Sequence, residues 1–193
     1  MWSPAFRHEE NSENYWTIDF RHEDFGGPVT CLEWAPYNAQ ILVAGSQDGT
    51  IALLQRCSEW TVIKLEAHRD GVFALSWFPN DKAFLSVGGD SIMSIWRMQG
   101  SEIEREDLNS AGGQINYAVC VNDSIITCGR NGALNVWREG VEQETILQID
   151  CPLWTATWNG VILGVTGSNN TVYFLKQDLL GQWEQVKSLD SLN

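Results

Sequence analysis

The sequence predicts an all-β fold built from four similar four-stranded sheets. Three observations support this fold class. Two sequence motifs recur about every 40 residues, the turns between apolar runs are too short to contain helices, and the apolar runs have no consistently polar side.

The best-defined repeat spans residues 67–98, AHRDGVFALSWFPNDKAFLSVGGDSIMSIWRM. Its three apolar runs, 71–78, 83–87 and 91–97, are separated by short polar turns that contain Pro79 or glycine. Such turns reverse an extended chain and leave no room for a helix. The repeat is therefore predicted to form a small antiparallel sheet.

Four side chains of this repeat, His68, Ser86, Asp90 and Trp96, have the chemistry of a hydrogen-bonded relay. If the strands pair, imidazole, hydroxyl, carboxylate and indole N–H can converge. We expect a structural role, because a buried polar group without a partner costs roughly 1–3 kcal/mol. A hydrolase using His68 and Ser86 is the alternative, but Ser86 lies in mid-strand without the sharp turn that presents a nucleophile. The chain is therefore not expected to be an enzyme.

Two columns of residues show that this repeat has three relatives. The first column closes the first strand of each repeat: Trp34, Trp77, Cys120 and Trp158. The second column lies in a later turn: Asp48, Asp90, Asn131 and Asn169. A fourth short strand is expected at 60–65, 103–107, 145–149 and 183–187. Four strands in each period of about 40 residues are typical of a propeller blade.

The apolar pattern within a repeat indicates that the blades stack. Large and small side chains alternate in the first strand of the best-defined repeat, Phe73, Leu75 and Trp77 against Val72, Ala74 and Ser76. A sheet with one wet face would alternate apolar and polar residues instead. We expect one propeller domain over 1–193, with an end strand in 1–20 and blades at 21–65, 66–107, 108–149 and 150–193.

Composition excludes several classes of function. The chain has 25 acidic and 12 basic residues, a net charge of −13, so nucleic-acid binding is not expected. It has no apolar run of about 18 residues for membrane insertion and begins without a signal-peptide pattern. Its five cysteines contain no C-x-x-C pair, which argues against disulfides and zinc. No cofactor or metal site is expected.

These motifs resemble the WD-repeat family over nearly the whole chain. The full relay occurs only in the 67–98 repeat, since the other three lack one or more of its members. Within the family, the stretches 31–55, 65–80 and 154–186 are similar to the small WD-repeat subunits of the COPII outer coat. The repeats resemble blades three to six of an open six-bladed propeller, preceded by one stray strand near 15–20. The resemblance thus implies an incomplete or open arc with apolar faces uncovered at both ends. The chain would then be either a truncated version or a shortened scaffold that depends more heavily on a partner.

The resemblance also implies a function. We expect a non-enzymatic scaffold in vesicle budding from the endoplasmic reticulum, peripheral on COPII vesicle membranes, with nuclear pore structure as a second use. The implied partners are the long helical outer-coat subunit and nuclear pore scaffold subunits, which would add a blade beside the last one. Trp154 is expected to pack between blades or to contact that partner. Another WD-repeat adaptor, reading a peptide on the top surface near Arg69, Asp70 and Arg130, is the alternative.

Overall fold

A computed structural model describes residues 2–5, 15–80, 82–100, 102–109, 113–138 and 141–190. Every regular element in this part of the chain is a β-strand. The first blade contains β3 (Val29–Trp34), β4 (Ile41–Ser46), β5 (Thr50–Arg56) and β6 (Trp60–Glu66). The second contains β7 (Val72–Trp77), β8 (Ala83–Gly88), β9 (Ile92–Gln99) and β10 (Glu102–Asn109).

The third and fourth blades repeat this plan. The third contains β11 (Ile115–Val121), β12 (Ser124–Gly129), β13 (Ala133–Arg138) and β14 (Val141–Gln148). The fourth contains β15 (Leu153–Trp158), β16 (Ile162–Gly167), β17 (Thr171–Gln177) and β18 (Trp183–Asp190). Strands pair antiparallel in chain order within each sheet. The prediction of four four-stranded propeller blades is confirmed.

Two details differ from the sequence expectation. The N-terminal segment holds a pair of strands, β1 (Trp2–Ala5) and β2 (Tyr15–Ile18), where one strand was expected. Pro4 within the short first strand conceals the pattern, because proline is uncommon inside sheets. Strand β14 begins at Val141, four residues before the expected start. The prediction missed these residues because they are mostly polar and lack strand periodicity.

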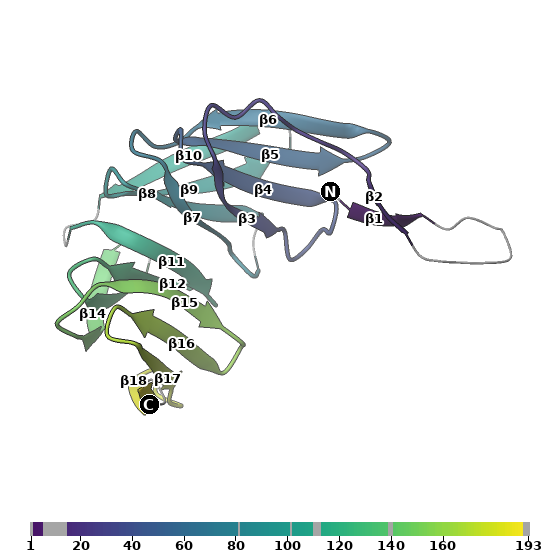
Figure 1. Ribbon diagram of the computed structural model, residues 1–193. Helices are drawn as coiled ribbons and strands as arrows, with labels where there is room; N and C mark the ends of the chain where they lie inside the picture. Colours follow the sequence, from purple (N-terminus) through teal and green to yellow (C-terminus); the bar gives the residue numbers. More distant parts are fainter. Residues whose placement is uncertain are drawn as a thin grey trace, which may run out of the picture.

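The four blades follow one another around a common centre (Figure 1). Contacts between inner strands join β3 to β7, β7 to β11, and β11 to β15. Within the described residues, no comparable contact joins β15 back to β3, so the blades form an open arc. Three apolar cores lie between successive blades, and each combines side chains from the two sheets that it joins.

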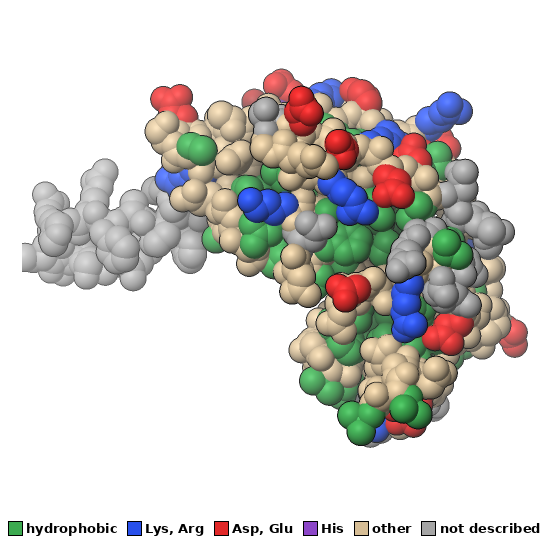
Figure 2. Space-filling view, turned by 180° about the vertical axis from the view of Figure 1, so that it is seen from behind, with side chains coloured by type: hydrophobic (Ala, Val, Ile, Leu, Met, Phe, Trp, Pro, Cys, Tyr) green, Lys and Arg blue, Asp and Glu red, His purple; other side chains and the backbone are tan. Residues whose placement is uncertain are grey.

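The outer strand of the second blade, β10, is strongly polar. In β10 the sequence EIEREDLN places charged side chains along the free edge of the sheet. Charged edges oppose unwanted strand pairing with other chains. On the face shown in Figure 2, Lys and Arg side chains are interspersed with Asp and Glu. The described residues include no helix long and apolar enough to cross a membrane.

Candidate functional site

The structure brings the four relay side chains together in the second blade. His68 precedes β7, Ser86 lies in β8, Asp90 lies in the turn after it, and Trp96 lies in β9. His68 Nδ1 is 3.0 Å from Asp90 Oδ1, and His68 Nε2 is 2.8 Å from Ser86 Oγ. Trp96 Nε1 donates to the same Ser86 hydroxyl over 2.9 Å. The set links the loop that precedes β7, here called the entry loop, to two strands and a turn.

All these bonds can be made in one direction. Trp96 donates to Ser86, Ser86 donates to His68 Nε2, and His68 Nδ1–H donates to the Asp90 carboxylate. This order requires a neutral imidazole with its proton on Nδ1. Burial lowers the pKa of His68 below its usual value, although Asp90 opposes this effect, so the neutral form is favoured. With this tautomer, every polar group of the relay has a partner.

The position of Ser86 argues against a nucleophilic role. Its side chain is completely buried in mid-strand, and its hydroxyl already has two partners. A substrate cannot approach the hydroxyl without opening the blade. The geometry therefore favours the structural role over the hydrolase alternative.

The other blades keep only parts of this relay. In the third blade, Trp137 Nε1 donates to Thr127 Oγ1 over 2.9 Å. The first and fourth blades carry apolar pairs at the equivalent positions, Ala44 with Leu54 and Val165 with Leu175. His22 packs its ring edge-on against Phe25, while Asp48 accepts hydrogen bonds from Thr50 and Gly26. His22 thus does not take the place of His68 in the first blade.

A recess of about 670 Å³ opens beside the relay. Arg105 lies on one wall, where its Nε donates to Asp107 Oδ1 over 2.6 Å and its guanidinium stacks over Trp96 at 5.1 Å. Arg69 and Asp90 line the entry loop side. The recess therefore presents charges of both signs on rigid elements.

The outward face of the first blade is apolar, and it is uncovered along its inner strand β3. Leu32 is 63% exposed and Trp34 is 40% exposed. At the equivalent positions of the second blade, Leu75 and Trp77 are 5% and 3% exposed because the first blade packs on them. The face thus has the side chains of an interface between blades. Exposed apolar faces of this kind are typical of protein interaction sites.

The segment before β3 covers part of this face. Phe20 stacks on Trp60 at 5.4 Å, and Phe25 packs on the same small cluster. Asp19 accepts a hydrogen bond from Trp60 Nε1 and pairs with Arg56. The cover leaves Leu32 and Trp34 exposed, so these two residues mark the open part of the face.

The outward face of the fourth blade differs from the expected apolar surface. Gly164 and Thr166 occupy positions where the second blade has Leu85 and Val87. A Cβ atom at Gly164 would meet only Thr157 Cγ2, at 3.6 Å. Small residues there leave a shallow hollow between the bulkier side chains of the face, Val172 and Phe174.

Trp154 lies on β15 and is half exposed, and its Nε1 donates to Ser168 Oγ over 2.6 Å. It lies at a β-bulge, because the pairing of β15 with β16 shifts between Leu153 and Thr155. Within this chain Trp154 bonds to its own blade. Its expected contact with a partner stays a proposal.

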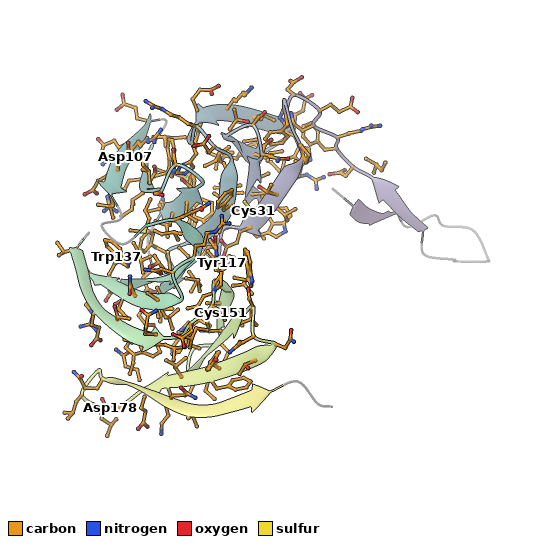
Figure 3. The ribbon with its side chains drawn as sticks, turned by 60° about the vertical axis from the view of Figure 1, so that its left-hand side comes forward. Cys31, Asp107, Tyr117, Trp137, Cys151 and Asp178 are labelled. Carbon is orange, nitrogen blue, oxygen red and sulfur yellow. The ribbon has the colours of Figure 1, made fainter. Side chains whose placement is uncertain are left out.

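Sequence reasoning missed Glu33, which joins the first two blades. Its Oε2 accepts from Trp77 N over 3.0 Å, and its main-chain oxygen accepts from Trp77 Nε1 over 3.2 Å. Burial raises the pKa of Glu33 to about 7, although the bond from Trp77 opposes this shift. Burial also raises the pKa values of Cys31 and Tyr117, with the charge of Glu33 as a smaller cause, and both residues lie towards the centre of the arc (Figure 3). The sequence did carry a signal, because Glu33 is acidic at a strand position where the other three blades have apolar or small residues.

Comparison with known families agrees with this geometry. The family model described as the anaphase-promoting complex subunit 4 WD40 domain matches residues 5–103. The chain belongs to the WD40-repeat family. The match covers β2, the first blade and the second blade as far as the start of β10, including the complete relay.

Several curated WD40-repeat relatives are similar over most of the chain. Protein transport protein sec13 of Emericella nidulans is 26% identical over 207 aligned residues, which cover 91% of this chain and 67% of the relative. The protein of the same name from Aspergillus oryzae is 26% identical, with 92% and 71% covered. Protein SEC13 homolog of Drosophila melanogaster is 26% identical, with 89% and 58% covered. The chain thus spans between 58% and 71% of the length of these three relatives.

Proposed function

We propose that this WD40-repeat chain is a non-enzymatic scaffold subunit in protein transport, and that a partner completes its propeller by adding a sheet beside the last blade. The observation that carries the proposal is the pair of end faces without a neighbouring blade, of which the first has the residues of an interface between blades and is covered only in part. The names of the similar proteins support the transport setting.

The gap between the fourth and first blades suits an added β-sheet. One wall offers Leu32 and Trp34, and the other offers the hollow at Gly164. A sheet with bulky side chains opposite Gly164 and apolar side chains opposite Leu32 would bury both walls. Apolar burial contributes about 25 cal/mol per Å², so area supplies the energy without chemistry.

The partner class follows from the resemblance to COPII outer-coat subunits. The long helical outer-coat subunit is the first candidate, and nuclear pore scaffold subunits are the second. Such a joint would place the chain on the cytoplasmic side of endoplasmic reticulum and COPII vesicle membranes, bound through protein and not through lipid. A rigid joint transmits curvature from one cage element to the next.

The test compares partner recovery by variants of the two walls. Leu32→Ser removes apolar surface from the first wall, and Gly164→Leu fills the hollow of the second. Affinity purification followed by mass spectrometry should recover helical coat subunits with the wild type and much less with either variant. Val161→Ser, in an exposed turn of the fourth blade, is the matched control and should recover as much as the wild type. Equal recovery by all four proteins would contradict the proposal.

Peptide recognition is the second candidate function, favoured by the recess beside the relay. Arg69 and Arg105 provide cationic donors, and Asp107 provides an acceptor. A peptide with both a carboxylate and a basic side chain would fit these charges. Arg69→Ala should abolish such binding without lowering recovery of the coat subunits, which separates the two functions.

A further inference from the structure

Every blade has a β-bulge at the second residue of its inner strand. The strand pairing shifts between Val29 and Cys31 in the first blade, and the same shift recurs at the start of β7, β11 and β15. A bulge turns one extra side chain away from the regular alternation. The four bulged residues are Thr30, Phe73, Asn116 and Trp154.

Two of these side chains reach the next blade in the same way. Thr30 Oγ1 donates to the main-chain oxygen of Val72 over 2.5 Å, and Val72 is the first residue of β7. Asn116 Nδ2 donates to the main-chain oxygen of Leu153 over 2.8 Å, and Leu153 is the first residue of β15. The bulge therefore forms a latch, in which a side-chain donor holds the start of the next inner strand.

The other two bulged residues differ from this pair. Phe73 has no hydrogen-bond donor in its side chain, so the second blade is joined to the third without this latch. Trp154 does carry a donor, but no blade follows it among the described residues. Its indole N–H is satisfied by Ser168 of its own blade, and the ring is half exposed. The fourth latch thus has a donor and lacks an acceptor from a next blade.

We infer that Trp154 is the latch donor for the sheet that a partner adds, with its indole N–H donating to the main-chain oxygen of the first residue of the added inner strand. The inference rests on the proposed function and adds its contact residue. The bond to Ser168 must open when the new bond forms, because an indole has one N–H. An acceptor on the main chain suits any partner sequence, so this contact sets the register of the added strand and not its side chains.

The inner strands also explain why a tryptophan suits this position. Thr30 and Asn116 reach a neighbour that is already packed in the same chain, whereas no blade follows Trp154 among the described residues. An indole has few rotatable bonds, so ordering it against an added sheet has a low entropic cost. Tryptophan is also enriched among interface residues that dominate binding.

The test separates the donor from the apolar ring. The probe is the blade-forming segment of the organism's own helical outer-coat subunit, titrated into the full chain by calorimetry. Trp154→Phe keeps an aromatic ring and loses the N–H, and it should weaken binding about five- to tenfold. Trp154→Asn loses the ring but keeps a donor, the same side-chain amide that Asn116 uses in the third blade. It should bind at least as well as Trp154→Phe.

Two other outcomes would overturn the inference. If Trp154→Phe binds like the wild type while Trp154→Asn binds weakly, the ring acts by apolar packing alone. If the wild type does not bind the probe at all, the proposed function fails, and the inference fails with it because no added sheet is present to accept the bond.

A measurement within the chain tests the latch itself without any partner. Phe73→Asn should supply the missing donor between the second and third blades and raise the melting temperature, while Asn116→Leu should lower it by about 2–4 °C. A fall with Phe73→Asn together with no change for Asn116→Leu would show that the bulge residues do not join blades, and would refute the inference.

Discussion

Replacing Ser86 by alanine should destabilise the chain more than any other loss of one oxygen atom from its blades. The Ser86 hydroxyl accepts from Trp96 Nε1 and donates to His68 Nε2, and all three side chains are buried. Ser86→Ala therefore leaves two polar groups without a partner. Each such group costs about 1–3 kcal/mol, so we expect a loss of about 2–6 kcal/mol in the free energy of unfolding.

Thr127→Val in the third blade is the matched control. Thr127 is as buried as Ser86 and accepts from Trp137 over 2.9 Å, but no histidine completes this pair. The control leaves one unpaired N–H and should cost about 1–2 kcal/mol. Urea unfolding followed by tryptophan fluorescence measures both losses under one set of conditions.

A double-mutant cycle shows whether the relay acts as a unit. Trp96→Phe removes the donor that Ser86→Ala leaves unpaired, so the double variant should lose less than the sum of the two single losses. Two results would refute the reasoning: a loss for Ser86→Ala no greater than for Thr127→Val, or strictly additive losses in the cycle.

Three further predictions concern burial and backbone. Because the pKa of Glu33 is raised to about 7 from 4.5, the folded chain holds this proton more tightly, and the free energy of unfolding should fall as pH rises from 4.5 to 7. Glu33→Gln should reduce this fall by about 1–2 kcal/mol, a figure lowered because Glu33 is partly exposed. Urea titrations at several pH values measure the change, and the same pH dependence in the variant and the wild type would contradict the prediction. Gly49→Ala should lower the melting temperature sharply, since the residue has φ +88° and a Cβ would overlap His68 O; calorimetry that finds no change would be inconsistent with this turn. Cys57 is exposed and should react with a thiol reagent at once, whereas burial raises the pKa of Cys128 to about 12 and should protect it until unfolding; equal rates would disprove the packing.

The repeating parts of the fold could be predicted because their signals repeat. Trp34, Trp77 and Trp158 mark the same strand position in three blades, and the turn column marks another. Two columns with one period fix the number of blades even where a single blade is ambiguous. The starting point of β14 was missed because an edge strand without an apolar face has no periodicity to detect.

The candidate site was less accessible to sequence reasoning. The convergence of His68, Ser86 and Asp90 followed from strand pairing, and the structure places them within hydrogen-bond distance. The raised pKa of Glu33 depends on burial between two blades, which no local pattern reports. The bulge at the second residue of each inner strand was also missed, because the bulged residues share a position and not a chemical type: Thr30, Phe73, Asn116 and Trp154.

The distribution of relay and apolar pairs follows the position of each blade in the arc. The two inner blades have hydrogen-bonded pairs, Ser86 with Trp96 and Thr127 with Trp137. The two end blades have apolar pairs at the same positions. A buried hydrogen bond fixes the relative placement of strands, because a small shift leaves its donor unpaired. An apolar pair tolerates such a shift with little loss of contact. We therefore expect the end blades to adjust to an added sheet more readily than the centre of the arc, as the proposed completion by a partner would require.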